Sequence, residues 1–105
     1  MTNIRDLDAR RIERALDQRV RYKYVHPRVL REGKGWKVVS PNCSRKIDPQ
    51  GGEIDIAWLV PEPEAGWLLY SRDHALGCWL MRLQSPSLPA LLTHLCEDPN
   101  REFWQ

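Results

Sequence analysis

Between residues 20 and 83 the chain is a succession of short strand-like segments with no helical pattern among them. The first of these, residues 20–24, alternates Val and Tyr with Arg and Lys, which is typical of a half-buried strand. Pro27 interrupts this segment, and residues 28–32 continue it as an edge or a bent second piece. A tight turn at Gly33-Lys34-Gly35 follows, and the further segments are 36–39, 54–60, 67–71 and 78–83. Parallel neighbours need a crossover of a dozen or more residues, usually a helix. We therefore expect a mainly antiparallel sheet of four to five strands.

Helical spacing of apolar residues occurs at the two ends of the chain. An N-terminal stripe of Ile and Leu predicts an amphipathic helix near residues 3–19. A leucine stripe predicts a second helix at residues 87–97, capped by Ser87 and ended by Asp98. Phe103 and Trp104 are too apolar to remain in water and are expected to dock on the core. The prediction is a single α+β domain, residues 1–105, with both helices packed on the sheet.

Several classes of protein fit the sequence poorly. No apolar stretch approaches the roughly 20 residues that span a bilayer, and the charged N-terminus predicts no secretory signal. Cys43, Cys78 and Cys96 are odd in number and far apart, so we expect reduced thiols and a cytoplasmic protein. No Cys-x-x-Cys pair is present, so we expect no metal site and no cofactor. A reactive Cys43 thiol beside Arg45 and Lys46 is a further alternative.

Charge is distributed unevenly along the chain. Residues 1–50 hold 13 Lys and Arg against 6 Asp and Glu, whereas residues 51–105 hold 3 against 8. A basic surface contributed by residues 20–50 would suit the phosphates of a nucleic acid. Its candidate residues are Arg21, Lys23, Arg28, Arg31, Lys34, Lys37, Arg45 and Lys46. The alternative is that the two halves pair their charges across a solvated surface.

The C-terminal half shows a Trp–Tyr strand in WLLYSRD, a later Trp79, a helix in SLPALL, and Asp98 followed by the pair Phe103-Trp104. This pattern resembles a bacterial family known only as a domain of unknown function. It departs from that family between Asp73 and Trp79, where the spacing is longer and a Lys is absent. The resemblance implies a fold and no particular activity.

A shorter stretch, GWKVVSPNCSR followed by GGEIDIAW, is similar to the front of restriction-endonuclease-like nucleases. The resemblance implies a metal-binding role for Asp55, because such nucleases hold a divalent ion at the scissile phosphate with paired carboxylates. The next strand, residues 67–72, has no Glu-x-Lys, so Asp55 and Glu53 predict at most a degenerate metal site. The structural alternative places both carboxylates on one face of a strand whose other face carries Ile54, Ile56 and Trp58.

These observations favour a non-catalytic interaction domain over an enzyme. Its most specific form is nucleic-acid binding through the basic residues of segment 20–50, without a membrane partner. A protein–protein or homodimer module is the alternative, and a degenerate nuclease domain is a further one. The sequence leaves open whether the five Trp side chains belong to the core or to the surface.

Overall fold

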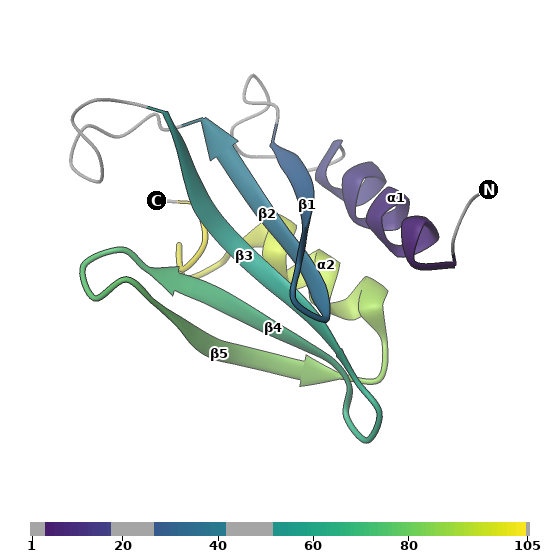
Figure 1. The fold of residues 1–105 in the computed structure, drawn as a ribbon. Helices are drawn as coiled ribbons and strands as arrows, with labels where there is room; N and C mark the ends of the chain where they lie inside the picture. Colours follow the sequence, from purple (N-terminus) through teal and green to yellow (C-terminus); the bar gives the residue numbers. More distant parts are fainter. Residues whose placement is uncertain (1–3, 18–26, 42–51, 105) are drawn as a thin grey trace.

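The computed structural model describes residues 4–17, 27–41 and 52–104. Along these residues run the helix α1 (Ile4–Asp17), the strands β1 (Arg28–Glu32), β2 (Gly35–Pro41), β3 (Glu53–Glu62), β4 (Gly66–Asp73) and β5 (Cys78–Ser85), and the helix α2 (Leu88–Glu97). The strands form one sheet in the order β1-β2-β3-β4-β5, and every pairing is antiparallel (Figure 1). The expected α+β fold is confirmed.

The turn between β1 and β2 depends on two glycines. Gly33 has a φ of 57°, in the left-handed region that a residue with a side chain rarely adopts. Gly35 begins β2 so close to the backbone carbonyl of Leu59 on β3 that a Cβ atom would collide with it. The turn that the sequence predicted at Gly33-Lys34-Gly35 is therefore present, and it also sets how closely β2 approaches β3.

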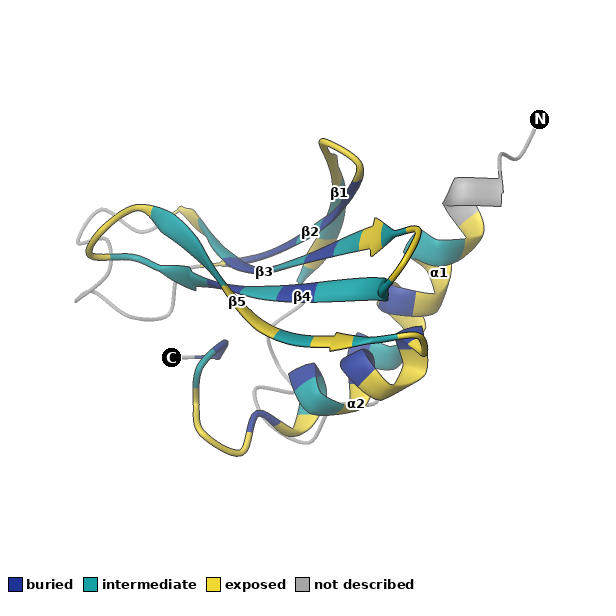
Figure 2. Cartoon of the chain, turned by 90° about the horizontal axis from the view of Figure 1, so that it is seen from below, coloured by how far each residue is buried: buried dark blue, intermediate teal, exposed yellow. Residues whose placement is uncertain are grey.

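Both helices lie on the same side of the sheet, so the molecule has two layers (Figure 2). The apolar side chains buried between the layers form one cluster. Its members are Ile12, Leu16, Trp36, Val38, Ile56, Ala57, Leu59, Leu69, Leu88, Leu91, Leu92, Leu95, Phe103 and Trp104. The sheet is thus packed on one face by helices, which is the way an antiparallel sheet can keep its second face for solvent or a partner.

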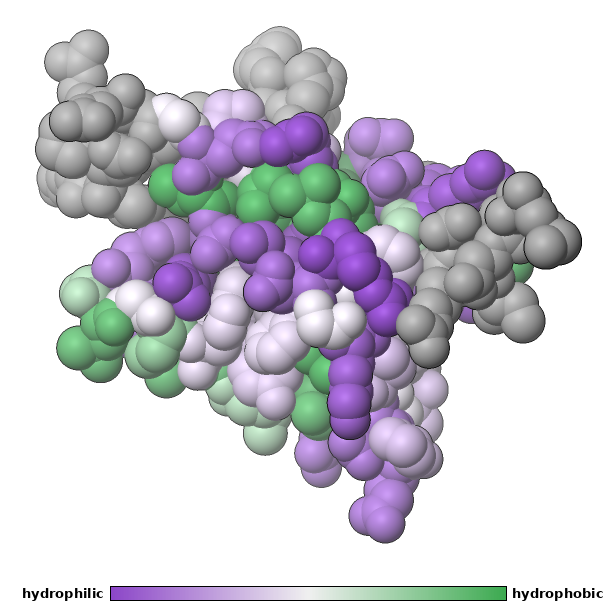
Figure 3. Space-filling model, viewed as in Figure 1, coloured by the Kyte–Doolittle hydropathy of each residue, from purple (hydrophilic) through white to green (hydrophobic). Residues whose placement is uncertain are grey.

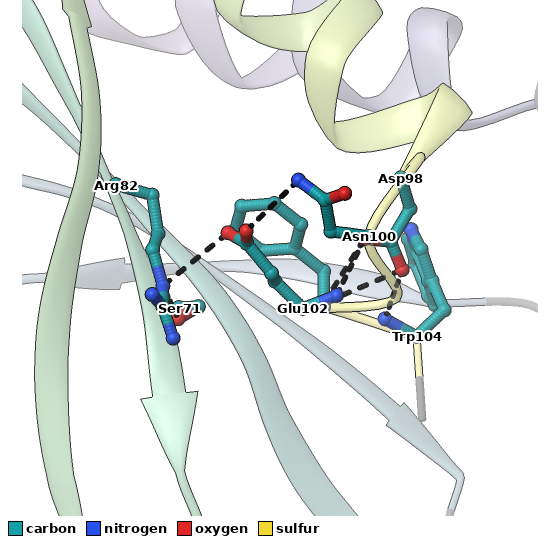
Figure 4. Close-up of polar contacts among 7 residues, drawn as sticks. Ser71, Arg82, Asp98, Asn100, Glu102 and Trp104 are labelled. Carbon is teal, nitrogen blue, oxygen red and sulfur yellow. Dashed lines mark hydrogen bonds and ion pairs between the residues drawn. The ribbon is translucent and has the colours of Figure 1, made fainter.

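The chain beyond α2 is held by one buried carboxylate. Asp98 caps α2 in a left-handed conformation and is 1% exposed. Its carboxylate accepts hydrogen bonds from the backbone N–H groups of Glu102 at 2.7 Å, Phe103 at 3.3 Å and Trp104 at 2.9 Å (Figure 4). Trp104 Nε1 donates a further bond to the carbonyl of Leu95 at 2.9 Å. The predicted docking of Phe103 and Trp104 on the core is confirmed.

A second contact ties this segment to the sheet. Arg82 on β5 donates from Nε to Ser71 Oγ at 2.8 Å, and the same nitrogen lies 3.3 Å from the Glu102 carboxylate (Figure 4). Ser71 is 1% exposed, so its hydroxyl needs a partner inside the protein. The Arg82 guanidinium supplies that partner, and it also neutralises the carboxylate of Glu102.

The register of β2 against β3 shifts next to Ile56, which has no partner on β2. Such a β-bulge turns two successive side chains toward the same face. Ile56 and Ala57 are accordingly both buried in the core, at 3% and 0% exposure. The sequence expectation that Trp58 shares a face with Ile54 and Ile56 is therefore wrong: the bulge places Trp58 on the face that carries Asp55.

Most expected boundaries agree with the structure to within two residues. The expected helices near 3–19 and 87–97 are observed at Ile4–Asp17 and Leu88–Glu97. The strand expected at 20–24, and with it Arg21 and Lys23, lies outside the described residues, as do Cys43, Arg45 and Lys46. In the described part of the chain, no helix has the length and apolar character needed to cross a membrane.

Candidate functional site

The face of the sheet that points away from α1 and α2 is called here the helix-free face. The strand registers assign to it Leu30, Glu32, Lys37, Asp55, Trp58, Tyr70, Arg72, Trp79 and Met81. Lys37 lies opposite Trp58, Trp58 opposite Tyr70, and Tyr70 opposite Met81. Residues paired across strands share a face, so these side chains form one surface that runs across β2, β3, β4 and β5.

Three aromatic rings, named here the aromatic row, cross this face from β3 to β5. The ring centroids of Trp58 and Tyr70 are 5.1 Å apart, and those of Trp58 and Trp79 are 5.8 Å apart, with tilted planes. Trp58 Nε1 donates to the backbone carbonyl of Glu32 at 3.0 Å, which fixes the orientation of the indole. All three residues are half-buried. Figure 3 views this face, where side chains of intermediate hydropathy gather at the centre, with strongly hydrophilic side chains around them and a band of hydrophobic ones above.

A small ionic network borders the aromatic row. One carboxylate oxygen of Asp55 lies 3.3 Å from Lys37 Nζ, and the other lies 3.7 Å from Arg72 Nε. Lys37 Nζ also lies 3.6 Å from Glu32. The Arg72 guanidinium lies 5.0 Å from the centre of the Trp79 ring, a cation–π contact. Positive charge is thus placed directly beside the aromatic row, with a carboxylate between the two cations.

The described members of the predicted basic surface do not form one continuous patch. Arg28 and Lys37 share the helix-free face, because they lie two ladder positions apart on it. Arg28 forms a bidentate pair with Glu53, and its hydrogen bond lowers the pKa of the Glu53 carboxyl below the ordinary value. Arg31 turns to the other face and lies 5.0 Å over the Trp36 ring, and Lys34 is in the β1–β2 turn.

The predicted degenerate metal site is not assembled as a metal site among the described residues. Glu53 and Asp55 do lie on one face, but each is paired with a cation, Glu53 with Arg28 and Asp55 with Lys37 and Arg72. No group of three His, Cys, Asp or Glu side chains that could hold a metal occurs in the described ranges. Lys37 Nζ lies between the carboxylates of Asp55 and Glu32, so an ammonium group stands where a shared metal ion would have to lie.

A shallow groove of about 630 Å³ lies at one end of the sheet. It is lined by Asp8, Arg31, Gly33, Lys34, Trp36, Pro61, Glu62, Pro63 and Gly66. Two basic and two acidic side chains surround it, so it presents no net charge to a ligand. The groove therefore does not favour one class of ligand over another.

The aromatic row was not predicted as a site from the sequence. In the sequence, Tyr70, Arg72 and Trp79 stand out only as parts of a family pattern. A signal was available, since Tyr70 and Arg72 alternate with Leu69 and Ser71 on one strand. The contribution of Trp58 could not be found in this way, because it depends on the bulge at Ile56.

Comparison with known proteins gives a family and no activity. No curated protein and no solved structure matches the chain. The whole length, residues 1–105, matches the family described as Domain of unknown function (DUF3024). The match covers every element described above, and it confirms the expected resemblance to a family of unknown function. The chain therefore belongs to the DUF3024 family.

Proposed function

We propose that this protein binds single-stranded nucleic acid on the helix-free face of its sheet. The observation that carries the proposal is the aromatic row of Trp58, Tyr70 and Trp79 beside Arg72. Unpaired bases stack on aromatic side chains and on guanidinium planes, and each such stack contributes about 1–3 kcal/mol to binding. No helix of the described residues covers this face, which leaves the sheet surface that this mode of binding needs.

Cations lie beside the row, each paired with a carboxylate of the same face: Arg28 with Glu53, and Lys37 and Arg72 with Asp55. They can meet the phosphates of a polyanionic ligand that competes with these carboxylates. Lys37 and Arg72 are within one ladder position of the rings, and Arg28 lies on the same face toward the edge strand β1. Such residues contact phosphates between stacked bases, and their contribution falls as salt rises. A single strand is favoured over a duplex because the bases of a duplex are stacked on one another and do not present free faces to the rings.

An amide titration with a short single-stranded oligonucleotide tests the proposal. The five indole N–H groups serve as internal reporters: Trp58 and Trp79 lie on the helix-free face, whereas the Trp104 indole bonds to Leu95 beneath the helices. We expect the Trp58 and Trp79 indole resonances to move and the Trp104 resonance to stay. An equivalent duplex is expected to bind more weakly. Shifts confined to the helices, or none at low salt, would contradict the proposal.

Substitution of Trp79 by Ala gives the quantitative test. Loss of one stacking ring is expected to weaken binding roughly 5- to 150-fold, the equivalent of about 1–3 kcal/mol. Arg72→Gln is expected to weaken binding and to reduce its salt dependence, since one phosphate contact is lost. Arg10→Gln on the exposed side of α1 removes the same charge from the helix layer and serves as the matched control. Equal losses in both arginine variants would argue against a defined surface.

A protein partner is the second candidate, and one observation favours it. Met81, 53% exposed, lies opposite Tyr70 on the helix-free face, and Leu76, 77% exposed, lies in the β4–β5 turn. Exposed apolar side chains beside aromatic rings are suited to a protein interface. Sedimentation of the protein at several concentrations measures self-association, and Met81→Glu is expected to abolish it. Self-association that resists Met81→Glu would exclude this face as the dimer interface.

A further inference from the structure

The two cations closest to the aromatic row are both held by one carboxylate. Asp55 contacts Lys37 at 3.3 Å and Arg72 at 3.7 Å, and the three side chains are 27%, 22% and 24% exposed. A tight charge-assisted hydrogen bond has a donor–acceptor distance of about 2.7–2.9 Å. The observed pairs are longer than this and partly exposed to solvent, and such pairs are weak. A phosphodiester carries one negative charge, as a carboxylate does, but it arrives as part of a polyanion whose binding releases counterions, so it can compete for the same two cations.

We propose that Asp55 acts as an internal substitute for phosphate, which holds Lys37 and Arg72 until the phosphate of a bound single strand displaces it. The inference rests on the proposed function and adds a regulatory element to the same surface. No bond is made or broken: the ligand phosphate takes over two ion pairs, and the Asp55 carboxylate returns to water.

The surroundings of the two cations allow this exchange. Arg72 is also positioned by the Trp79 ring, 5.0 Å from its guanidinium carbon, so it stays beside the row when Asp55 is displaced. Lys37 retains Glu32 at 3.6 Å as a second neighbour. Asp55 lies on the helix-free face opposite Val39, and the bulge at Ile56 brings Trp58 to the same face. The Asp55 carboxylate thus lowers the affinity of Lys37 and Arg72 for other anions, and it keeps both cations in position for a phosphate.

The test compares Asp55→Asn with the wild-type protein in binding to a short single-stranded oligonucleotide. We expect Asp55→Asn to bind about tenfold more tightly at low salt, because the phosphate then has no Asp55 carboxylate to displace from the two cations. We expect the slope of log association constant against log salt to stay the same, because both proteins make the same phosphate contacts once the strand is bound. Asp8→Asn on α1 is the matched control, since it removes an equal charge from a pair with Arg11 at 3.9 Å.

The outcomes separate this inference from the function on which it rests. Tighter binding with an unchanged slope in Asp55→Asn alone supports it. A steeper slope in Asp55→Asn overturns it, because the wild-type cations would then not contact phosphate. Equal binding by wild type and Asp55→Asn overturns the inference and leaves the proposed function standing. An equal gain in Asp8→Asn also overturns it, because overall charge then suffices. Absence of binding in every protein overturns both proposals.

Two further measurements guard against a variant that fails to fold. Asp55→Ser also removes the carboxylate, with a smaller side chain, and must give the same gain. In the wild-type protein, the ¹³C resonance of the Asp55 carboxyl group must move when the oligonucleotide saturates the site. An unmoved resonance overturns the proposal. The gain from Asp55→Asn must also shrink when Arg72→Gln is added, because the effect is assigned to the released cations.

Discussion

His74 is a residue whose protonation is affected by the fold. It begins the β4–β5 turn and is half-buried. Burial lowers the pKa of its imidazole, and the nearby Arg72 guanidinium lowers this pKa further, while Asp55 and Asp73 act in the opposite direction. The folded protein therefore favours the neutral ring.

This pKa shift predicts a pH dependence of stability. The unfolded chain binds the His74 proton more tightly than the folded protein, so the free energy of unfolding falls as pH drops below the ordinary value of ~6.5. Above that pH the His74 imidazole is neutral in both states, so it no longer makes the free energy of unfolding depend on pH. We expect wild type to lose stability relative to His74→Gln between pH 8 and pH 5 in urea unfolding. A constant difference between the two proteins across this range would show that His74 does not sense the fold.

At the scale of elements, the segment Asp98–Trp104 depends on the Asp98 carboxylate. Asp98→Ala leaves buried backbone N–H groups without an acceptor, and such groups cost about 1–3 kcal/mol each. We expect Asp98→Ala to lower the free energy of unfolding by about 3 kcal/mol or more. Asp98→Asn tolerates the left-handed φ of 43° and keeps one acceptor oxygen, so it should cost less.

Chemical denaturation measures both variants against Glu97→Ala, which alters the exposed neighbouring residue. Equal effects in Asp98→Ala and Glu97→Ala would contradict the anchoring role of the carboxylate. An Asn variant as damaging as the Ala variant would show that one acceptor oxygen is not enough to hold the segment.

The elements themselves were largely predictable from sequence. The leucine period gave α2, and the glycine pair at Gly33 and Gly35 gave the first hairpin, because both signals are local. The bulge at Ile56 is different. It depends on how β2 and β3 pack against the helices, and the sequence of one strand does not show that packing. The bulge decides on which face Trp58 lies. The alternation of apolar and polar residues along β3 therefore could not predict that Trp58 belongs to the candidate site.

At the scale of the whole molecule, the two faces of the sheet differ in their tolerance of substitution. Leu69 is fully buried under the helices, whereas Met81, on the adjacent strand, is 53% exposed on the helix-free face. We expect Leu69→Ala to cost about 2–5 kcal/mol, with cavity formation included, and Met81→Ala less than about 1 kcal/mol. Thermal and urea unfolding measure the difference. Similar costs would show that the helix-free face is covered in solution.

The whole molecule also resolves the question of the five Trp residues. Trp36 and Trp104 are buried in the core and Trp67 packs against it, while Trp58 and Trp79 lie on the helix-free face. Composition could not separate these two groups, because a large ring suits a core and a binding surface equally well. Sequence likewise predicted a basic half, but among the described residues its cations are distributed over both faces and a turn.

The strand order β1-β2-β3-β4-β5 has a consequence for how the chain reaches this structure. Every strand pairs with its neighbour in sequence, so the sheet can assemble by closing short loops, which costs little chain entropy and is fast. The contact between the helices is of another kind: the Cys96 thiol on α2 lies 3.4 Å from the Ala15 carbonyl on α1, 81 positions away. Folding is therefore expected to be limited by the meeting of the two ends of the chain, after the sheet between them has formed.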